Sequence, residues 1–281
     1  MTETFKKIKL IHITESFGAG TFMVLSQIVN SLDLREYDIS IVYSLRQETP
    51  PDFRDGFDSS VRFIHLSMVR KVNLAMDIKS LFGLWRLLTK EKPDVIHLHS
   101  SKAGVLGRIA ARFSGVHRVF YSPHGFSFLR QDINQTTRNL YHFFEKIASR
   151  FGGTVIACSE SELGVARSIT NKSILIRNAV DIEAIDKCLG SSPASIARQK
   201  KRTTIGISGR ITKQRAPALF GKISREISKA RAGLVRFIWI GGGENIAHLS
   251  DTSVEITGGL THEDALKKLH REVDVYLHTS L

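Results

Sequence analysis

Hydrophobic and polar residues follow two alternating patterns along most of the chain. Short runs rich in β-branched residues, typical of buried strands, alternate with stretches in which apolar residues recur every three or four positions, typical of helices. The first part of the chain predicts strands at 7–14, 38–44, 61–66, 94–99, 118–122, 154–158 and 174–176, and helices at 19–32, 77–90, 105–113, 137–150 and 160–169. This alternation predicts an α/β fold in which helices cover both faces of a parallel sheet.

The pattern is interrupted once and then restarts. Residues 190–195 are small and mostly polar and residues 198–202 are basic, a composition typical of an exposed connection. After it, strands are predicted at 203–208, 235–240, 254–257 and 273–278, and helices at 217–229 and 261–271. We therefore predict a first domain at 1–185, a linker at 186–202 and a second Rossmann-like domain at 203–281. This second domain offers about four strands, where a doubly wound nucleotide-binding sheet usually has about six.

The helix predicted at 77–90 carries an apolar stripe. Its members recur at the spacing of successive helical turns and are Ile78, Leu81, Phe82, Trp85 and Leu88. This periodicity predicts that the five side chains share one face of the helix.

The charge balance points to an anionic partner. The 281 residues include 40 Lys and Arg against 27 Asp and Glu, a net charge of +13. Phosphate groups, nucleic acid and an acidic membrane surface would all suit this excess. The basic residues are spread along the chain, whereas a nucleic-acid binder is expected to cluster them on one face.

Cysteine usage and hydropathy indicate a cytoplasmic protein. The two cysteines, Cys158 and Cys188, do not form a C-x-x-C pair, so a reducing compartment is expected. No signal-peptide pattern is found at the N-terminus, and no window is apolar enough to span a membrane.

Two glycines stand where the first predicted strand meets the first helix. Gly18 and Gly20 begin like a G-x-G-x-x-G dinucleotide fingerprint, but Met23 occupies the third glycine position and no acidic residue ends the second strand. A dinucleotide site is therefore disfavoured. Two interpretations remain: a tight turn, or a turn whose backbone amides approach an anionic substrate at a helix N-terminus.

Histidines end two further strands of the first domain. His97 and His99 point to the same face of a strand, and two such rings can bind zinc, but no third ligand is evident nearby. His99, Ser100 and Lys102 fit a polar loop on the substrate side of the sheet better. His124 is held between Pro123 and Gly125 after the next strand, either as a turn residue or as a functional one.

The second domain repeats this arrangement with glycines and arginines. Gly209 and Arg210 follow its first strand and Arg215 lies in the same loop, so two guanidinium groups are placed to bind a diphosphate, unless the loop is simply solvated. Gly243 and Glu244 end the glycine-rich turn after its second strand, which allows close backbone approach to a ligand or forms a flexible turn. No phosphate-binding P-loop and no G-x-S-x-G hydrolase elbow is present.

The order of these motifs carries more information than any one of them. The Gly-rich first turn is followed by P-H-G-F, I-R-N-A-V-D, G-R-I-T-K-Q-R, F-I-W-I-G-G-G-E and I-T-G-G-L. In this order the sequence resembles family 4 glycosyltransferases of bacterial surface-polysaccharide synthesis, over nearly the whole chain. The resemblance implies the GT-B fold, in which two Rossmann-like domains face a cleft, here with an incomplete second domain because the sequence ends at Leu281, before the family's glycine-rich turn with two glutamates.

The resemblance also implies a role for each matching residue. It places His124, Arg210 and Arg215 in catalysis, with His124 at the donor sugar and the arginines at the donor diphosphate. The donor-binding set that it implies is Gly18, Gly20, Gly209, Arg210, Arg215, Gly243 and Glu244. It places Asn178 and Asp181 in the hinge between the domains. Arg215 and Ala216 stand where the family has lysine and glycine, and the bulkier arginine alters the expected grip on phosphate.

A working family member transfers a sugar, with retention of anomeric configuration, from a nucleotide-diphosphate sugar to a hydroxyl. The resemblance implies that no metal and no cofactor other than this donor substrate is needed. It also implies a lipid-linked or polysaccharide glycan as acceptor, as in capsule or lipopolysaccharide synthesis. The basic excess and amphipathic helices suit peripheral attachment to an anionic membrane surface. No nucleic-acid partner is expected. The alternative is an inactive, truncated glycosyltransferase that retains only acceptor or membrane binding.

Overall fold

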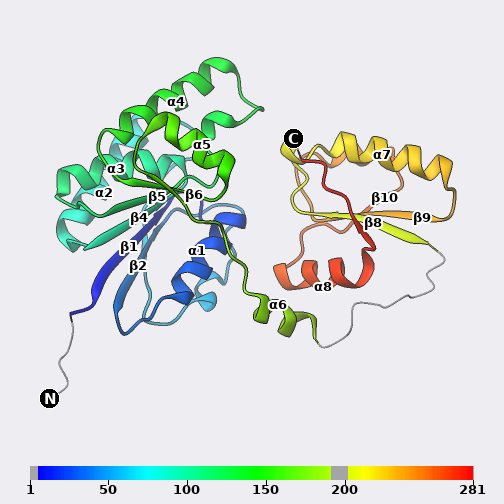
Figure 1. Cartoon of the computed structure of the whole chain (residues 1–281), viewed down its shortest axis with the longest axis horizontal. Helices are drawn as coiled ribbons and strands as arrows, with labels where there is room; N and C mark the ends of the chain where they lie inside the picture. Colours follow the sequence, from blue (N-terminus) through cyan, green and yellow to red (C-terminus); the bar gives the residue numbers. More distant parts are fainter. Residues whose placement is uncertain (1–5, 191–201, 281) are drawn as a thin grey trace. The chain divides into compact units, whose positions relative to one another are not determined.

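A computed structural model describes residues 6–190 and 202–280. The chain divides into two compact units, residues 1–180 and 181–281, which are described separately below. Each unit contains a parallel sheet with helices packed on it, as the sequence predicts (Figure 1).

The first unit is built on a seven-stranded parallel sheet with the order β3-β2-β1-β4-β5-β6-β7. Its strands are β1 (Ile8–Thr14), β2 (Tyr37–Tyr43), β3 (Arg62–His65), β4 (Val95–His99), β5 (Val119–Ser122), β6 (Thr154–Ala157) and β7 (Ser173–Leu175). Its α-helices are α1 (Ala19–Ser31), α2 (Leu74–Glu91), α3 (Ser101–Ser114), α4 (Gln135–Ser149) and α5 (Glu160–Ile169). Because all strands are parallel, their carboxyl ends meet at one edge of the sheet, where ligand sites of such sheets form.

Two apolar clusters hold the helices to opposite faces of this sheet. One joins strand residues such as Ile96 and Leu98 to Leu84 of α2 and Leu106 of α3. The other joins residues of β2 to α1 and includes a group of aromatic rings around Phe17. α2 and α3 thus lie on one side of the sheet and α1 on the other, as Figure 1 shows.

Helix α2 differs from the prediction in which side chains it buries. Leu84 and Leu88 are fully buried, whereas Ile78, Phe82 and Trp85 are 57%, 56% and 37% exposed. The predicted single stripe is therefore wrong, because the apolar residues occupy two adjacent faces and only one of them packs on the sheet. The other face remains on the surface of the first unit.

A buried ion pair links α3 to α4. Arg108 donates to the Glu145 carboxylate over 2.6 Å, and Tyr121 donates its hydroxyl proton to the same carboxylate over 2.7 Å. The guanidinium also donates to the Gly104 carbonyl and lies over the Tyr121 ring. Every charged group in this network has a partner, which is the condition for a tolerable buried charge.

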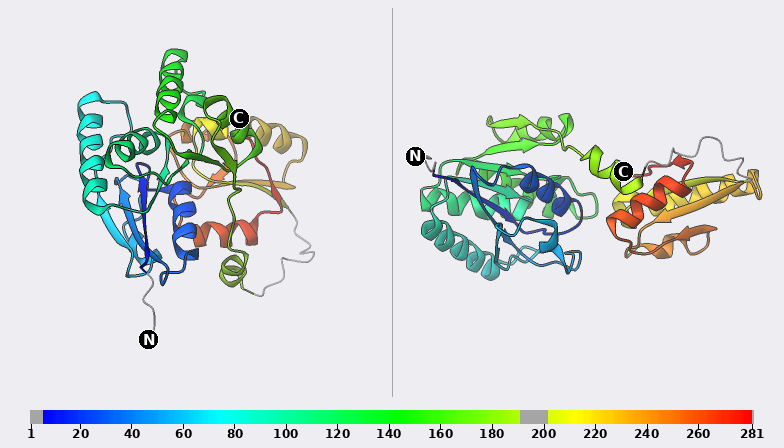
Figure 2. Two further views of the ribbon diagram at one scale, coloured as in Figure 1. Left: turned by 60° about the vertical axis from the view of Figure 1, so that its left-hand side comes forward. Right: turned by 90° about the horizontal axis from the view of Figure 1, so that it is seen from below.

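The second unit has a four-stranded parallel sheet with the order β10-β9-β8-β11 among the residues described. Its strands are β8 (Thr203–Ser208), β9 (Val235–Ile240), β10 (Val254–Ile256) and β11 (Val275–Tyr276), and its α-helices are α6 (Ile182–Leu189), α7 (Pro217–Ala230) and α8 (His262–Glu272). α7 and α8 lie on opposite faces of the sheet (Figures 1 and 2). Thr261 caps α8 by accepting from the Asp264 amide, as its capping-box position predicts.

The predicted linker is partly helical. Asp181 caps α6 by accepting from the Ala184 amide, and the helix continues to Leu189 and contacts α8. Residues 186–189, which the sequence analysis placed in an exposed linker, thus form the end of a helix that buries none of its residues. The sequence from 191 to 201, which suggested the linker, lies outside the described residues. Within the described part of the chain, the structure has no helix long and apolar enough to cross a membrane.

Candidate functional site

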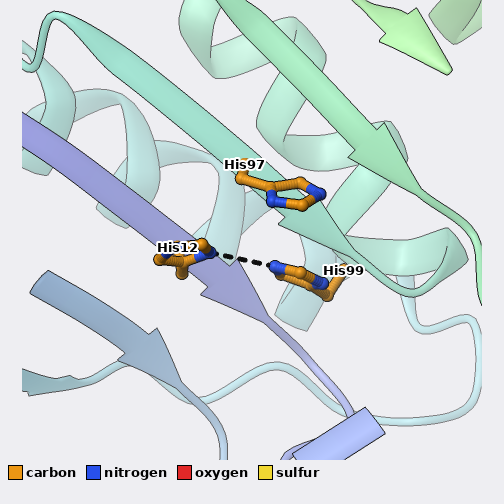
Figure 3. Close-up of side chains that lie close together, drawn as sticks. All are labelled: His12, His97 and His99. Carbon is orange, nitrogen blue, oxygen red and sulfur yellow. Dashed lines mark hydrogen bonds between the residues drawn. The ribbon is translucent and has the colours of Figure 1, made fainter. Parts of the chain in front are cut away.

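Four histidines gather at the carboxyl ends of β1, β4 and β5 in the first unit. His12 of β1 is paired in register with His97 of β4, and His99 follows on the same face of that strand. Nδ1 of His12 lies 3.1 Å from Nε2 of His99, and Nδ1 of His99 lies 3.0 Å from Nε2 of His124. Figure 3 shows the rings of His12, His97 and His99 close together, with the contact between His12 and His99 marked.

Burial keeps these imidazoles neutral. It lowers the pKa of His12 from 6.5 to about 3 and holds the pKa values of His97 and His99 well below 6.5. Burial also lowers the pKa of His124, although the nearby Glu162 carboxylate opposes the shift. A neutral imidazole carries one N–H donor and one acceptor nitrogen, so the cluster is a set of directional hydrogen-bonding groups without charge.

The three rings of His12, His97 and His99 also form a possible metal site. Their ring nitrogens lie within 4.8 Å of one another, and His12 supplies the third ligand that the sequence analysis did not find near His97 and His99. The group contains no carboxylate or thiolate among the residues described. Three neutral imidazoles are a donor set that catalytic zinc sites use, with water in the fourth position. Without a metal ion, His12 and His99 contact each other directly as neutral hydrogen-bonding groups.

Backbone conformation is unusual at the ends of β4 and β5. Ser100 has φ 75° and ψ 156°, a region used mainly by glycine, and His124 has φ 52°. Each is held by a buried carboxylate. The Ser100 hydroxyl donates to Glu15 over 3.1 Å, and the Gly125 amide donates to Glu162 over 2.8 Å. Strain of this kind persists where the surrounding structure fixes it, which is common at functional sites.

The other predicted residues of the first unit have more ordinary surroundings. Gly18 precedes α1 in an extended conformation, and a Cβ atom there would lie 3.0 Å from the Glu48 backbone, so glycine allows a close approach of two chain segments. Gly20 is exposed in α1 and has open space around it. Lys102 is held by an ion pair of 2.6 Å with Asp77 of α2.

In the second unit, two glycine turns contact each other through their backbones. Gly209 follows β8 and Gly241 follows β9, with φ values of 133° and 136° that only glycine adopts readily. A Cβ atom on Gly241 would lie 2.4 Å from the Gly209 carbonyl oxygen, and one on Gly243 would lie 2.5 Å from the Ile211 oxygen. The indole N–H of Trp239 donates to the Gly209 carbonyl and fixes the first turn to β9.

The side chain of Arg215 lies over the first of these turns. Its guanidinium occupies the space in which a Gly209 Cβ atom would stand, 2.6 Å from that position. Among residues 6–190 and 202–280 it has no hydrogen-bond or ion-pair partner, while Thr279 donates to its backbone carbonyl. Arg210 and Glu244 are exposed in the same two turns. A half-buried guanidinium without an acidic partner, beside glycine backbone, suits an anionic ligand.

The backbone conformation of Ala216 accounts for the glycine that the family has at this position. It has φ 46° and ψ 59° and precedes α7, so this position calls for a left-handed conformation that glycine adopts at lower energy. The residues matched to the hinge lie at the division between the units: Asn178 is exposed before it, and Asp181 caps α6 after it.

Sequence reasoning missed His12, Glu15 and Glu162. His12 is a polar residue within a strongly apolar strand, and Glu15 directly follows that strand, so both positions carried a signal. Their roles depend on the pairing of β1 with β4, which brings together residues about 85 positions apart. Glu162 was predicted only as part of a helix, although it also binds the loop of His124.

Two parallel sheets, each covered by helices and each with polar or glycine-rich turns at its strand ends, define a protein of two Rossmann-like units. Residues 19–169, more than half of the chain, match the family model of the glycosyl transferase 4-like domain, and the chain belongs to this family.

The chain is also similar to individual characterised proteins. It is 32% identical over 238 residues to the Escherichia coli UDP-Gal:alpha-D-GlcNAc-diphosphoundecaprenol alpha-1,3-galactosyltransferase, which covers 81% of this chain and 60% of the relative. Among solved structures, Anabaena HepE in complex with UDP and glucose superposes with a TM-score of 0.70, and the lipopolysaccharide outer core galactosyltransferase WaaB with 0.65. Each is 16% identical and aligns with 97% of this chain and 74% of its own. These structures support the GT-B fold. The chain spans 60% of the length of the E. coli relative.

Proposed function

We propose that this chain transfers a sugar from a nucleoside-diphosphate sugar to a lipid-linked glycan in surface-polysaccharide or lipopolysaccharide synthesis. The E. coli relative is named for a galactosyl transfer to a diphosphoundecaprenol-linked sugar, and the HepE structure contains UDP and glucose. In this proposal the second unit binds the donor nucleotide and diphosphate. In the first unit, His124, the half-buried member of the histidine cluster, binds the transferred sugar, and the neighbouring strand ends bind the acceptor.

One observation carries the proposal: the Arg215 guanidinium lies over the glycine turn after β8 with no acidic partner among the described residues. When the bond between the anomeric carbon and the β-phosphate oxygen breaks, negative charge accumulates on the departing diphosphate. Arg215, assisted by Arg210, would stabilise that charge, a role that needs no metal ion. We further propose that the anomeric configuration is retained.

Donor binding and transfer test this proposal. We would measure the binding of UDP and UDP-galactose by calorimetry, and transfer to a diphosphoundecaprenol-linked GlcNAc acceptor by mass spectrometry. Removal of one such charge-stabilising group typically lowers turnover by roughly 100-fold or more, so Arg215→Ala should nearly abolish transfer, while Arg215→Lys should retain part of it.

The matched control is Arg225→Ala, which removes an exposed arginine of α7 and should change neither binding nor transfer. Product NMR then reports the anomeric configuration. If the chain binds no nucleotide sugar, or if Arg215→Ala binds and transfers like the unchanged protein, the proposal is wrong. Acceptor binding without transfer would favour the inactive alternative.

We also propose that the first unit attaches to the anionic cytoplasmic face of the membrane through the exposed face of α2. Leu74, Ile78, Phe82 and Trp85 form a stripe along this helix and are 76%, 57%, 56% and 37% exposed. At 3.6 residues per turn, the exposed basic residues of the helix lie beside the stripe: Lys79, Arg86 and Lys90. Apolar insertion flanked by basic residues is the pattern of interfacial helices, and each such cation adds about 1 kcal/mol near anionic lipid.

Vesicle flotation tests this surface. The protein should float with vesicles that contain phosphatidylglycerol and not with pure phosphatidylcholine vesicles, and the double variant Phe82→Ser/Trp85→Ser should remain in solution. Leu234→Ser, which changes an equally exposed leucine of the second unit, is the control and should float normally. Flotation that is independent of lipid charge, or unaffected by the α2 variant, would remove the proposal.

A further inference from the structure

We propose that His12 and His99 form a hydrogen-bonded chain that sets the tautomer of His124, so that His124 carries its proton on Nδ1 and presents an N–H donor at the strand ends. His12 and His99 are positioning residues in this proposal, because they act through His124. The consequence for sugar transfer rests on the proposed function, whereas the tautomer itself can be measured without any substrate.

The geometry connects the three rings in one line. His12 contacts His99 through Nδ1 and Nε2 at 3.1 Å, and His99 contacts His124 through its other nitrogen at 3.0 Å. The planes of the His99 and His124 rings differ by only 7°, and their centroids are 5.3 Å apart, so the two rings meet edge to edge. Figure 3 shows the inner part of this line, in which the His12 and His99 rings face each other across β1 and β4. His97 lies to the side, where its Nε2 contacts the Ser122 hydroxyl at 2.9 Å.

Because each ring is neutral, all hydrogen bonds in such a chain must run in the same direction. Each neutral imidazole has a single N–H, so if His12 donates to His99, then His99 donates to His124, and the His124 proton is left on Nδ1. In the opposite direction, His124 donates inward from Nε2 and the last proton lies on Nε2 of His12. Burial favours the neutral form of these rings, because His12 and His99 are fully buried and His124 is half-buried.

The buried end of the chain decides between the two directions. Nε2 of His12 has no hydrogen-bond partner among the described residues and no contact with solvent. In the inward direction this nitrogen would be an N–H donor without an acceptor, and buried donors of that kind are rare in proteins. In the outward direction it is only an unused lone pair. The structure therefore favours donation from His12 to His99 and from His99 to His124.

The outer end of the chain is able to reach a ligand. His124 is only half-buried, and Nδ1 of His124 has no partner among residues 6–190 and 202–280. Its backbone is fixed by the Gly125 amide, which donates to Glu162. A protonated Nδ1 would donate to a hydroxyl or ring oxygen of a sugar, whereas a bare Nδ1 would only accept. The chain would thus decide which sugar atoms His124 recognises.

The test is the tautomer of His124 in the ¹⁵N-histidine-labelled 281-residue protein, read from long-range ¹H–¹⁵N correlation spectra at neutral pH. We expect a protonated Nδ1 and an unprotonated Nε2 for His124, assigned by its loss in His124→Gln. The exposed His117 gives the spectrum of an unconstrained ring. A His124 proton on Nε2 would overturn the proposal.

Two variants at His12 test whether the hydrogen-bonded chain of histidines sets the tautomer of His124. His12→Leu removes the donor and should give a mixture of His124 tautomers, whereas His12→Asn keeps an amide N–H near the position of Nδ1 and should restore the Nδ1 proton. If the protein transfers sugar, His12→Leu should lower kcat by roughly tenfold, the effect of losing one hydrogen bond. KM for the nucleotide should be unchanged.

An unchanged His124 tautomer in His12→Leu would overturn the proposal, as would stoichiometric zinc in the purified protein. A metal ion would take ring nitrogens of His12 and His99 that the chain requires. If His12→Leu does not fold, the tautomer of the unchanged protein still decides the direction. Because the spectra need no donor or acceptor, a protein that transfers no sugar would refute the proposed function without affecting this result.

Discussion

The strand ends of the two units are built by different means. In the first unit, buried side chains meet there: neutral imidazoles contact one another, and the carboxylates of Glu15 and Glu162 hold strained turns. In the second unit, backbone meets backbone at Gly209 and Gly241, and the nearby charge comes from arginines that remain partly exposed. The first arrangement gives directional hydrogen bonds without charge, and the second gives charge close to an accessible main chain.

Under the proposed function, the difference suits the two halves of a sugar donor. A sugar ring presents hydroxyl groups that are recognised by oriented donors and acceptors, whereas a diphosphate is recognised by guanidinium groups and backbone amides. The comparison also predicts that different changes destabilise the two units. The first should be sensitive to the loss of buried polar partners and to acid, and the second to any added side-chain volume in its turns.

The largest effect is expected from Glu145→Leu in the first unit. The substitution leaves the Arg108 guanidinium, 1% exposed, without its carboxylate partner, which typically costs about 3–5 kcal/mol. Urea unfolding followed by circular dichroism measures the loss. The double variant Arg108→Met/Glu145→Leu removes both charges and should recover most of it. If the double variant is as unstable as the single one, packing rather than charge explains the effect.

Gly241→Ala should damage the second unit next most severely. The new methyl group would lie 2.4 Å from the Gly209 oxygen at φ 136°, so we expect a loss of about 2 kcal/mol or more together with weaker UDP binding. Gly242→Ala is the matched control, because its nearest neighbour would be 3.4 Å away and its φ is not positive. Equal stability of the two variants would contradict the backbone-to-backbone contact.

Acid should destabilise the first unit through its histidines. The folded-state pKa of His12 is about 3, below the 6.5 of the unfolded chain, so the unfolded state binds more protons in this window and stability falls as pH falls below 6.5. For His12 alone, lowering the pH from 7 to 5.5 should cost about 1 kcal/mol. Hydrogen exchange read by mass spectrometry should show faster exchange in peptides of β1 and β4 than in peptides of β8 and β9. Faster exchange in β8 and β9 than in β1 and β4 would contradict the assignment of this acid sensitivity to the histidines of the first unit.

The smallest effect is expected at Ala216. Relief of the left-handed strain at φ 46° by Ala216→Gly is partly offset by the greater flexibility of glycine in the unfolded chain, which leaves a gain of about 0.5 kcal/mol. Ala218→Gly, on the exposed side of α7, should lose up to about 1 kcal/mol instead. Thermal unfolding measures both, and a loss of stability in Ala216→Gly would show that the turn is not strained.

The regular elements were the most predictable part of the fold. β8 and β9 have the predicted bounds, because a short β-branched run followed by glycine leaves little ambiguity. α6 was missed because the polar residues that follow it suggested a linker, although Asp181 is a good helix cap. In α2, the periodicity identified the helix but not the face that packs, since apolar residues cover two faces.

The histidine cluster was only half predictable. His99 and His124 stand at predicted strand ends, so they could be proposed from local sequence alone. The pairing of His12 with both His97 and His99 depends on which strands lie side by side, and this order, β2-β1-β4, is not written in the local pattern. The contact between the two glycine turns likewise required the pairing of β8 with β9.

The two tryptophans of the chain fall one in each unit, and in opposite surroundings. Trp85 stands on the exposed face of α2, while Trp239 is fully buried and bonded to the Gly209 turn. The protein therefore contains its own pair of fluorescent reporters: Trp85 in the first unit should emit at longer wavelength than the buried Trp239 in the second. Emission from a Trp85→Phe variant would follow the glycine turns during nucleotide titration, and the signal lost in that variant would follow the approach of α2 to lipid.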